Sequence, residues 1–455
     1  MAERILTLRE QQLFVDYLTA LQAAPIRYVL LRNYEGFPAS VGHDLDLFIP
    51  RADVHRAAAI FRDLLAQAGG CAIVVHERDY FTDVRFTVDS PVSAALHLDL
   101  FHGSFTWHGL PYLTEQRLLA QASSHGGHPI PRPAHEALNL LFGSILWGGF
   151  FKTRYQPRIA ELLATPGERE EFDRCVRDAF GATGAPPFDP CSPEHPAKTF
   201  VRDYARKLRR AFKLQSLRRA PFTALALLAR YWSVEIKAML HPLGLHLAIL
   251  GPDGAGKSTL IAGIIARVGE LFGERHLHHW RPSVLPDVGV LMGNRETSTM
   301  PVVDPHGKLP HPAPVALLRV AYYWLDYWLG WLPLILRRKA QVHLVIFDRY
   351  ADDIWCDPRR YRFALPQALL RTVAWLTPRP DFTFVLLADA ALLAQRKGEI
   401  PSDAVAEITA RYRTLAARGG RCIALDAAEP VETLLDRIET VIVEYLRQRE
   451  NGRQT

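Results

Sequence analysis

The feature that most constrains this chain is a glycine-rich turn in its second half. An apolar run, LHLAIL at residues 245–250, is followed by GPDGAGKS at 251–258 and then by a stretch with helical periodicity. The turn has the spacing GxxxxGK[ST]. Between a strand and a helix, this spacing aims backbone amides and the positive end of the helix at phosphate oxygens. We therefore expect a P-loop α/β domain whose ligand is ATP or a related triphosphate.

Individual residues of the turn have predicted roles. Lys257 should bridge the phosphates, and the Ser258 hydroxyl should be a ligand of Mg²⁺. The glycines let the backbone turn inward around the phosphate oxygens. The residues predicted to hold ATP are Gly251, Gly254, Gly256, Lys257, Ser258 and Thr259.

Two later segments read as further strands of the same sheet. HLVIFDRY at 343–350 places Asp348 and Arg349 at the carboxyl end of a strand, the edge where open α/β sheets bind ligands. Asp348 is expected in the Mg²⁺ shell, and Arg349 is expected to grip an acceptor phosphate with its planar fork. PDFTFVLLADAALLAQRKGE at 380–399 adds a strand and then Arg396 and Lys397, for which a solvated charge run is the alternative reading.

Together these segments resemble the thymidylate kinase family over residues 243–450. GPDGAGKST is similar to that family's phosphate loop, DRY to its acceptor-phosphate motif, the 380–399 segment to its strand and lid, and IALDAAEPVETLLDRI to its closing strand and helix. The resemblance implies that Asp253 faces the acceptor. It also implies that a transition-state cation comes from the lid, with Arg396 the first choice, because the loop has Ala255 and no arginine.

The chain departs from that family on the acceptor side. RET at 295–297 is the one hint of the family's early motif, and ADDIWCDPRRYR follows the DRY triplet. We therefore expect phosphoryl transfer from ATP to a nucleoside monophosphate or another small phosphorylated or hydroxylated compound. The rival hypothesis is a nucleotide-binding assembly or regulatory protein in which the N-terminal module is the active transferase.

The first half reads as an α+β module with acidic residues on its strands. HDLDLFIP places Asp44 and Asp46 two residues apart, which points both carboxylates to one face, and LHLDLFHG adds Asp99. Three such carboxylates suit a Mg²⁺-dependent nucleotidyl transfer site. Residues 26–101 resemble the nucleotidyltransferase superfamily, with RNYEGFP where that family has a Gly-Ser loop. A solvated edge strand, or this fold without activity, is the alternative.

The basic residues are concentrated in one segment. Residues 196–240 contain 11 Lys and Arg against 2 acidic residues, and their apolar positions recur at helical spacing with a break expected near Pro221. A solvated connector between two enzymes is the first reading, an anionic membrane surface the second, and nucleic acid the last. The aromatic run at 320–336 is expected to be a buried helix beside the acceptor cleft, since it is short for a membrane span, and an interface with lipid or an apolar acceptor is the alternative.

The length of 455 residues allows two or three domains. We expect a nucleotidyltransferase-like α+β domain at 1–130, a helical extension at 131–195, a basic helical connector at 196–240, and a doubly wound P-loop kinase domain at 241–455. The five cysteines are scattered and lack CxxC spacing, which excludes a disulfide framework and a zinc knuckle. The start of the chain lacks a signal-peptide pattern, so a cytoplasmic location is expected. A homodimer is left open.

Overall fold

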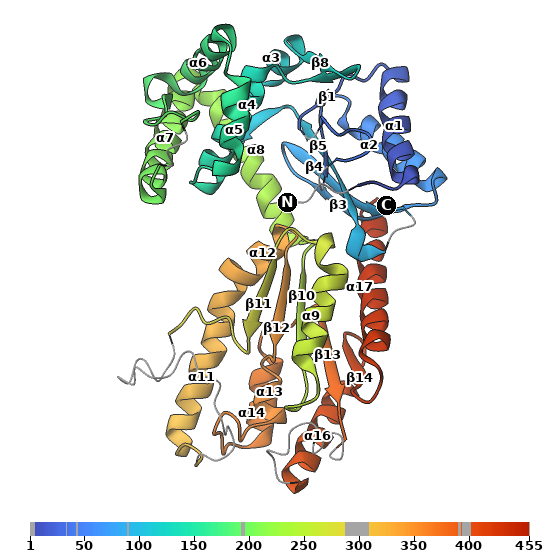
Figure 1. Cartoon of the computed structure of the whole chain (residues 1–455). Coiled ribbons are helices and arrows are strands. Elements are labelled where there is room, and N and C mark those ends of the chain that lie inside the picture. The colour runs from blue at the N-terminus through green and yellow to red at the C-terminus, as the bar shows by residue number, and fades with distance from the viewer. Residues whose placement is uncertain are drawn as a thin grey trace. The chain divides into compact units, whose positions relative to one another are not determined.

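The computed structural model describes residues 5–32, 34–41, 44–88, 91–192, 196–286, 309–389, 393 and 402–454. The chain forms two compact units, unit 1 at Met1–Lys237 and unit 2 at Ala238–Thr455 (Figure 1). Two sets of sequence predictions lie outside the described residues. They are the 295–297 motif and the lid residues Arg396 and Lys397.

Unit 1 is built on a mixed five-stranded sheet with the order β1-β2-β5-β4-β3. Strands β2 and β5 run parallel, and the other neighbouring pairs are antiparallel. The strands are β1 (Val29–Leu30), β2 (Asp44–Ile49), β3 (Cys71–Glu77), β4 (Phe81–Thr87) and β5 (Leu96–His102). Two small hairpins follow, β6 (Ser104–Trp107) with β7 (Leu110–Thr114), and β8 (Ser123–His125) with β9 (His128–Ile130).

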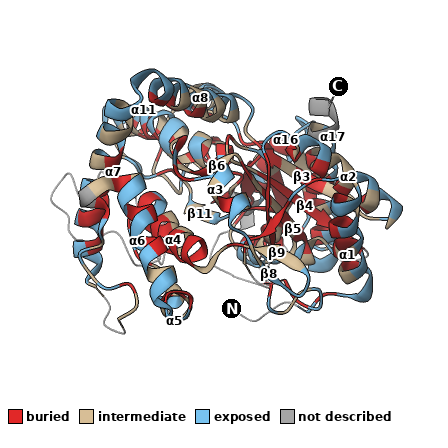
Figure 2. Ribbon diagram, turned by 90° about the horizontal axis from the view of Figure 1, so that it is seen from above, coloured by how far each residue is buried: buried red, intermediate tan, exposed pale blue. Residues whose placement is uncertain are grey.

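Helices α1 (Leu8–Ala23) and α2 (Val54–Gln67) contribute to the same apolar core as one face of this sheet. Leu45 and Leu47 of β2 belong to that core. Because side chains alternate along a strand, Asp44 and Asp46 point to the opposite face. Figure 2 shows β4 and β5 buried between the two layers that cover the sheet. The acidic face of β2 therefore lies toward the helical half of unit 1.

That helical half has a core of its own. Leu138, Phe142, Phe180 and Phe212 pack together in it, and Phe48 of β2 joins them from the sheet. The long basic helix contributes Phe212, so it is folded onto unit 1. The helices are α3 (Glu115–Ala120), α4 (Pro133–Gly143), α5 (Gln156–Leu162), α6 (Pro166–Phe180), α7 (Lys198–Arg219) and α8 (Pro221–Leu240), the last pair separated at the expected proline.

Unit 2 is built on a five-stranded sheet in which every neighbouring pair is parallel, in the order β11-β12-β10-β13-β14. Helices α9 and α17 pack together, whereas α11, α14 and α16 share a core with Ala248 of β10 and Phe347 of β12. The prediction of a parallel α/β sheet for this half is confirmed. Its elements are β10 (Leu245–Leu250), α9 (Lys257–Val268), β11 (Arg275–His279), α11 (Ala313–Gly330), α12 (Arg337–Ala340), β12 (Leu344–Asp348), α13 (Asp353–Cys356), α14 (Gln367–Trp375), β13 (Phe382–Leu387), α16 (Ser402–Ala416), β14 (Cys422–Asp426) and α17 (Val431–Gln454).

The aromatic helix α11 differs from the sequence expectation of a buried helix. One face is buried through Val320, Tyr323 and Tyr327, whereas Leu318 is 73% exposed and Trp328 is 46% exposed. The helix lies on the outside of the sheet, so only one stripe of it can reach the core. None of the helices in the described ranges is long and apolar enough to cross a membrane.

Candidate functional site: a phosphate loop and a carboxylate cluster

The glycine-rich turn connects β10 to α9 in the way the sequence predicts. Gly251, Gly254 and Gly256 all have left-handed backbone angles, with φ of 146°, 84° and 98°. A Cβ atom on Gly251 would lie 2.7 Å from the backbone oxygen of Leu386 on the neighbouring strand. Only glycine fits that position, and the turn brings the chain to the first residue of α9, Lys257.

Lys257 is folded back over its own loop. Its Nζ donates hydrogen bonds to the backbone oxygens of Gly251 at 3.0 Å and Pro252 at 2.8 Å, and the residue is only 7% exposed. Burial, together with the nearby Arg349 guanidinium, lowers the pKa of Lys257 to about 8. The ammonium group is therefore held at the phosphate loop, where its surroundings disfavour the protonated form.

Asp253, at the top of the loop, is the centre of a charged cluster. Its carboxylate accepts hydrogen bonds from the guanidinium groups of Arg349 and Arg360 and lies 3.7 Å from Lys257 Nζ. Burial would raise the pKa of Asp253, but the three cations outweigh burial and hold it well below its usual value. The Asp253 carboxylate therefore occupies the N–H donors of Arg349 and Arg360 that a bound phosphate would need.

Arg349 is locked in place by several independent contacts. It is 2% exposed, and its Nη1 donates to Asp353 at 2.7 Å. Asp353 is fully buried and also accepts hydrogen bonds from Tyr361, at 2.7 Å, and from Tyr412. The backbone φ of Arg349 is 75°, a strained value for a residue with a side chain. The surrounding hydrogen bonds compensate for this strain and fix where the guanidinium lies.

Asp348 ends β12 directly beside Ile249 of β10, at the carboxyl edge of the sheet. Its Oδ2 lies 3.4 Å from Nδ1 of His279, while its Oδ1 is buried without a hydrogen-bond partner within the described structure. Burial would raise the pKa of Asp348, but the His279 contact and the charges of Lys257 and Arg349 hold it below its ordinary value. An ionised oxygen without a partner, with Ser258 exposed at the start of α9, fits the hard oxygen ligands that Mg²⁺ prefers.

The structure thus brings together most of the residues predicted for this site. Lys257, Asp253 and Arg349 are linked by direct contacts. Sequence reasoning missed Arg360 and Asp353, which complete the cluster. The spacing of four residues between Arg349 and Asp353 across a helix start was a usable signal for one of them. No local pattern pointed to Arg360, because its partner lies 107 residues away.

The second group of predicted residues gathers on the sheet of unit 1. Asp46 and Asp99 are directly opposed on the parallel strands β2 and β5, and ligand atoms of Asp44, Asp46 and Asp99 all lie within 4.8 Å of one another. Burial raises the pKa of Asp46 to about 6, although Arg32 opposes the shift. Burial and the neighbouring carboxylates, Asp83 on β4 first among them, raise the pKa of Asp99 well above its usual value. Burial and mutual repulsion thus disfavour the charged forms of Asp46 and Asp99.

Arg32 is the cation that faces this cluster, and sequence reasoning did not single it out. It lies two residues after β1 in the chain. Its guanidinium donates to both oxygens of Asp46, one of them at 2.8 Å, and to Asp44 at 3.3 Å. The carboxylates fit a divalent cation by donor type and spacing, and a protein cation stands beside them.

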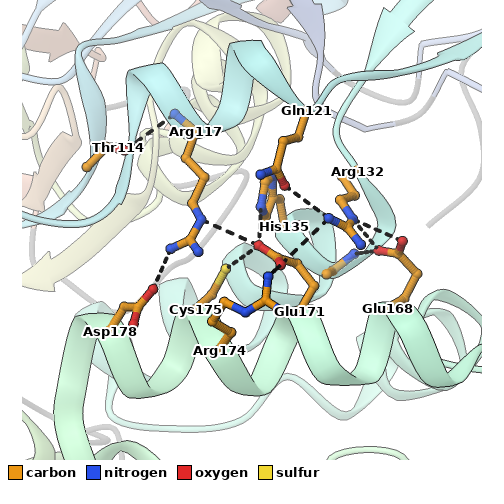
Figure 3. A network of polar contacts seen from close by, with 11 residues as sticks. Thr114, Arg117, Gln121, Arg132, His135, Glu168, Glu171, Arg174, Cys175 and Asp178 are labelled. Atoms are coloured by element: carbon orange, nitrogen blue, oxygen red, sulfur yellow. Dashed lines mark hydrogen bonds and ion pairs between the residues drawn. The ribbon is translucent and has the colours of Figure 1, made fainter.

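A further cluster, around Glu171 of α6, could suggest a metal site but does not fit one. The Glu171 carboxylate is 2% exposed. Three guanidinium groups surround it, so its charge is already neutralised within the protein (Figure 3). The network connects α3 and α4 to α6 and stabilises the packing of these helices. The residues around Glu171 are Arg117, Arg132, Arg174, His135 and Cys175.

The parallel sheet, the glycine loop and the lysine at the helix start give this α/β unit the features of a phosphate-binding loop. Comparison with known protein families and with curated sequences finds no match. Among solved structures, the chain is similar to thymidylate kinase from Candida albicans, at 16% identity over 45% of this chain and 93% of that one, with a TM-score of 0.34. It is also similar to thymidylate kinase from Ehrlichia chaffeensis, at 14% identity over 44% of this chain and 98% of that one, with a TM-score of 0.31.

Proposed function

We propose that unit 2 is an ATP-dependent phosphotransferase that acts on a small phosphorylated acceptor, such as a nucleoside monophosphate. The observation that carries this proposal is the arrangement around Lys257, where the glycine turn, the start of α9 and the oxygen of Asp348 lie at one edge of a parallel sheet. That edge is where parallel sheets of this type bind nucleotides. The nucleotidyltransferase-like assignment of unit 1 is a separate proposal, given below.

The reaction is the transfer of the terminal phosphoryl group of ATP to an oxygen of the acceptor, with release of ADP. The loop amides and Lys257 would hold the donor phosphates, and Ser258 and Asp348 would hold Mg²⁺, which supplies charge neutralisation when bound. Arg396 is proposed as the cation that stabilises the transition state, on the family resemblance alone. The protein's own part is therefore to position two phosphate groups and to balance their charge.

The acceptor side is proposed to work by exchange. Asp253 now occupies the forks of Arg349 and Arg360, and an acceptor phosphate can replace its carboxylate on the same guanidinium groups. Arg360 is 21% exposed, whereas Arg349 is buried and held by Asp353. We therefore expect Arg360 to move toward the acceptor and Arg349 to stay in place and position it.

The test is ADP formation that depends on an added acceptor. A panel of nucleoside monophosphates and sugar phosphates is screened with ATP and Mg²⁺, first with the wild-type chain and then with Lys257→Ala. The variant should fold normally and lose at least about 100-fold in turnover, about 2.7 kcal/mol of transition-state stabilisation. Lys237→Ala, on the exposed side of α8, is the matched control. ATP binding without acceptor-dependent ADP formation would instead favour the assembly or regulatory hypothesis.

We also propose that unit 1 is a metal-dependent nucleotidyltransferase-like module with Asp44, Asp46 and Asp99 as its metal ligands. The observation in favour is the convergence of these carboxylates from two neighbouring strands. Asp46→Asn should abolish Mg²⁺-dependent release of pyrophosphate from a nucleoside triphosphate and leave ATP binding by unit 2 unchanged. If wild-type chain releases no pyrophosphate from any triphosphate tested, unit 1 has the fold without this chemistry.

An anionic membrane surface is proposed as a partner of the helices α7 and α8. The outer face of α8 carries Phe222, Leu225, Trp232 and Ile236, all at least half exposed and three to seven residues apart, and the basic helix α7 directly precedes α8 in the chain. Apolar side chains beside basic ones suit a bilayer with anionic headgroups. Co-sedimentation with phosphatidylserine vesicles should exceed that with phosphatidylcholine vesicles and should fall for Trp232→Ser. Equal sedimentation with both would contradict the proposal.

A further inference from the structure

Unit 1 contains a cavity of about 420 Å³ beside its carboxylate cluster. The cavity lies between the acidic face of the sheet and the segment that follows α4. Its lining includes several aromatic side chains, and a planar or apolar group of a ligand can pack against them. Among these rings are Tyr80, Phe81, Phe101, Phe105, Tyr112 and Trp147.

The cavity also has charged side chains in its lining. Arg32 and Asp99 line it together, and Lys152 lines it as well. The Arg32 side chain is 37% exposed, so it is accessible from the cavity even while it bonds Asp46 and Asp44. The cavity lining therefore combines aromatic rings with carboxylates, Asp99 and Glu136, and with two cations, Arg32 and Lys152.

Arg32 is a partial replacement for a metal ion. It supplies a single positive charge to three carboxylates, and it contacts two of them. The hydrogen bonds of Arg32 go to Asp46 and Asp44 and not to Asp99, and Asp99 Oδ1 is buried with no hydrogen-bond partner in the described part of the chain. A divalent cation would serve all three carboxylates at once, and the arginine would then be released from Asp46.

We propose that Arg32 is an exchangeable counter-ion. It holds the carboxylates when no metal is bound, and it moves to the phosphate of a ligand in the aromatic cavity when a divalent cation takes its place. The ligand class that fits is a phosphate or pyrophosphate ester with a planar or apolar body. The phosphate meets Arg32 and Lys152, and the body packs on the rings. The inference rests on the metal site proposed for unit 1 and is independent of the phosphotransferase proposed for unit 2.

The exchange has a thermodynamic signature. A metal and a phosphate ligand should each strengthen the binding of the other, because the metal frees the guanidinium that the phosphate uses. Removal of the guanidinium should make the metal bind well without any phosphate. A permanent structural ion pair between Arg32 and Asp46 would show neither effect.

The experiment locates Mn²⁺ by anomalous scattering in crystals of the full chain, with and without pyrophosphate, and measures its affinity by titration calorimetry. In the wild-type chain, a Mn²⁺ peak between Asp44, Asp46 and Asp99 should require pyrophosphate, and Arg32 should then contact the pyrophosphate. In Arg32→Gln the peak should form with Mn²⁺ alone, and its affinity should be at least about tenfold higher than in the wild-type chain. Arg51→Gln, at another arginine of unit 1, should behave like the wild type.

The position of the peak separates this site from any pyrophosphate bound at the phosphate loop. If Arg32→Gln binds no Mn²⁺ at the carboxylates, the metal site and this inference both fail. If the wild-type chain binds Mn²⁺ there while Arg32 remains on Asp46, the metal site stands and the exchange is wrong. Should Arg32→Gln fail to fold, Arg32→Lys replaces it. A lysine lacks the planar fork with which Arg32 bonds both oxygens of Asp46, so Mn²⁺ should bind this variant more tightly than the wild type, and an unchanged affinity overturns the exchange.

Discussion

The two sites of this chain both set arginines against aspartates, but with different charge balance. At the phosphate loop, Lys257, Arg349 and Arg360 face Asp253, Asp353 and Asp348, so cations and carboxylates match in number. In unit 1, Arg32 bonds two members of a cluster of three carboxylates. At the first site an incoming anion would have to displace an internal carboxylate, whereas at the second the carboxylates outnumber the arginine that bonds them. Local charge balance therefore indicates what each site binds.

The largest expected effect comes from removing a carboxylate at the phosphate loop, where cations and carboxylates match in number. Asp353→Ala leaves Arg349 buried without its main partner and removes the acceptor for two tyrosine hydroxyls. The free energy of unfolding should fall by about 3–5 kcal/mol, as for other broken buried ion pairs. Urea unfolding measures it. Asp44→Ala, at a partly exposed carboxylate of the cluster in unit 1, is the comparison. It should lower the free energy of unfolding by about 1 kcal/mol or less. Equal losses at the two positions would contradict the difference between the sites.

A smaller effect tests the arginine fork. Arg349→Lys keeps the charge but loses the bidentate geometry that joins Asp253 to Asp353. The KM for a monophosphate acceptor should rise about tenfold, since a charge-assisted hydrogen bond is worth about 1.5–3 kcal/mol, and the KM for ATP should barely change. Steady-state kinetics with each substrate varied in turn separates the two. A loss of ATP affinity with unchanged acceptor KM would place Arg349 on the donor side.

The smallest effect is a pH dependence that only the phosphate loop should show. With a pKa of about 8, Lys257 is charged at pH 7 and loses its charge as the pH rises through 8. The Kd for ATP should therefore rise by up to about tenfold by pH 9, and Lys257→Arg should remove this rise. Isothermal titration of ATP from pH 7 to 9 measures it.

The same group should change stability in the opposite direction. In the unfolded chain Lys257 keeps its proton up to its ordinary pKa of 10.5, whereas the folded chain releases it near 8. Between these values the unfolded state binds more protons, so this group makes the free energy of unfolding increase with pH. ATP affinity that is flat from pH 7 to 9 in the wild-type chain would contradict the depressed pKa.

How much could be predicted from the sequence differs between the two sites for a physical reason. The phosphate loop is contiguous, so GPDGAGKS specified its turn, its lysine and its place on the sheet. Strand alternation was enough to bring Asp44 and Asp46 to one face. The partners that complete both sites, Arg360 and Arg32, come from loops whose paths depend on the whole fold. The exposed face of α11 was also missed, because an apolar run does not reveal which side the protein covers.

The left-handed backbone at Arg349 has a consequence for which residues this position tolerates. Glycine, and to a lesser degree asparagine, adopt such an angle with little strain, whereas β-branched residues do so poorly. A glycine here would relax the backbone but would leave the buried carboxylate of Asp353 without its cation. The arginine is therefore retained at a backbone angle that its side chain disfavours, and its ion pair supplies the stability that the angle costs.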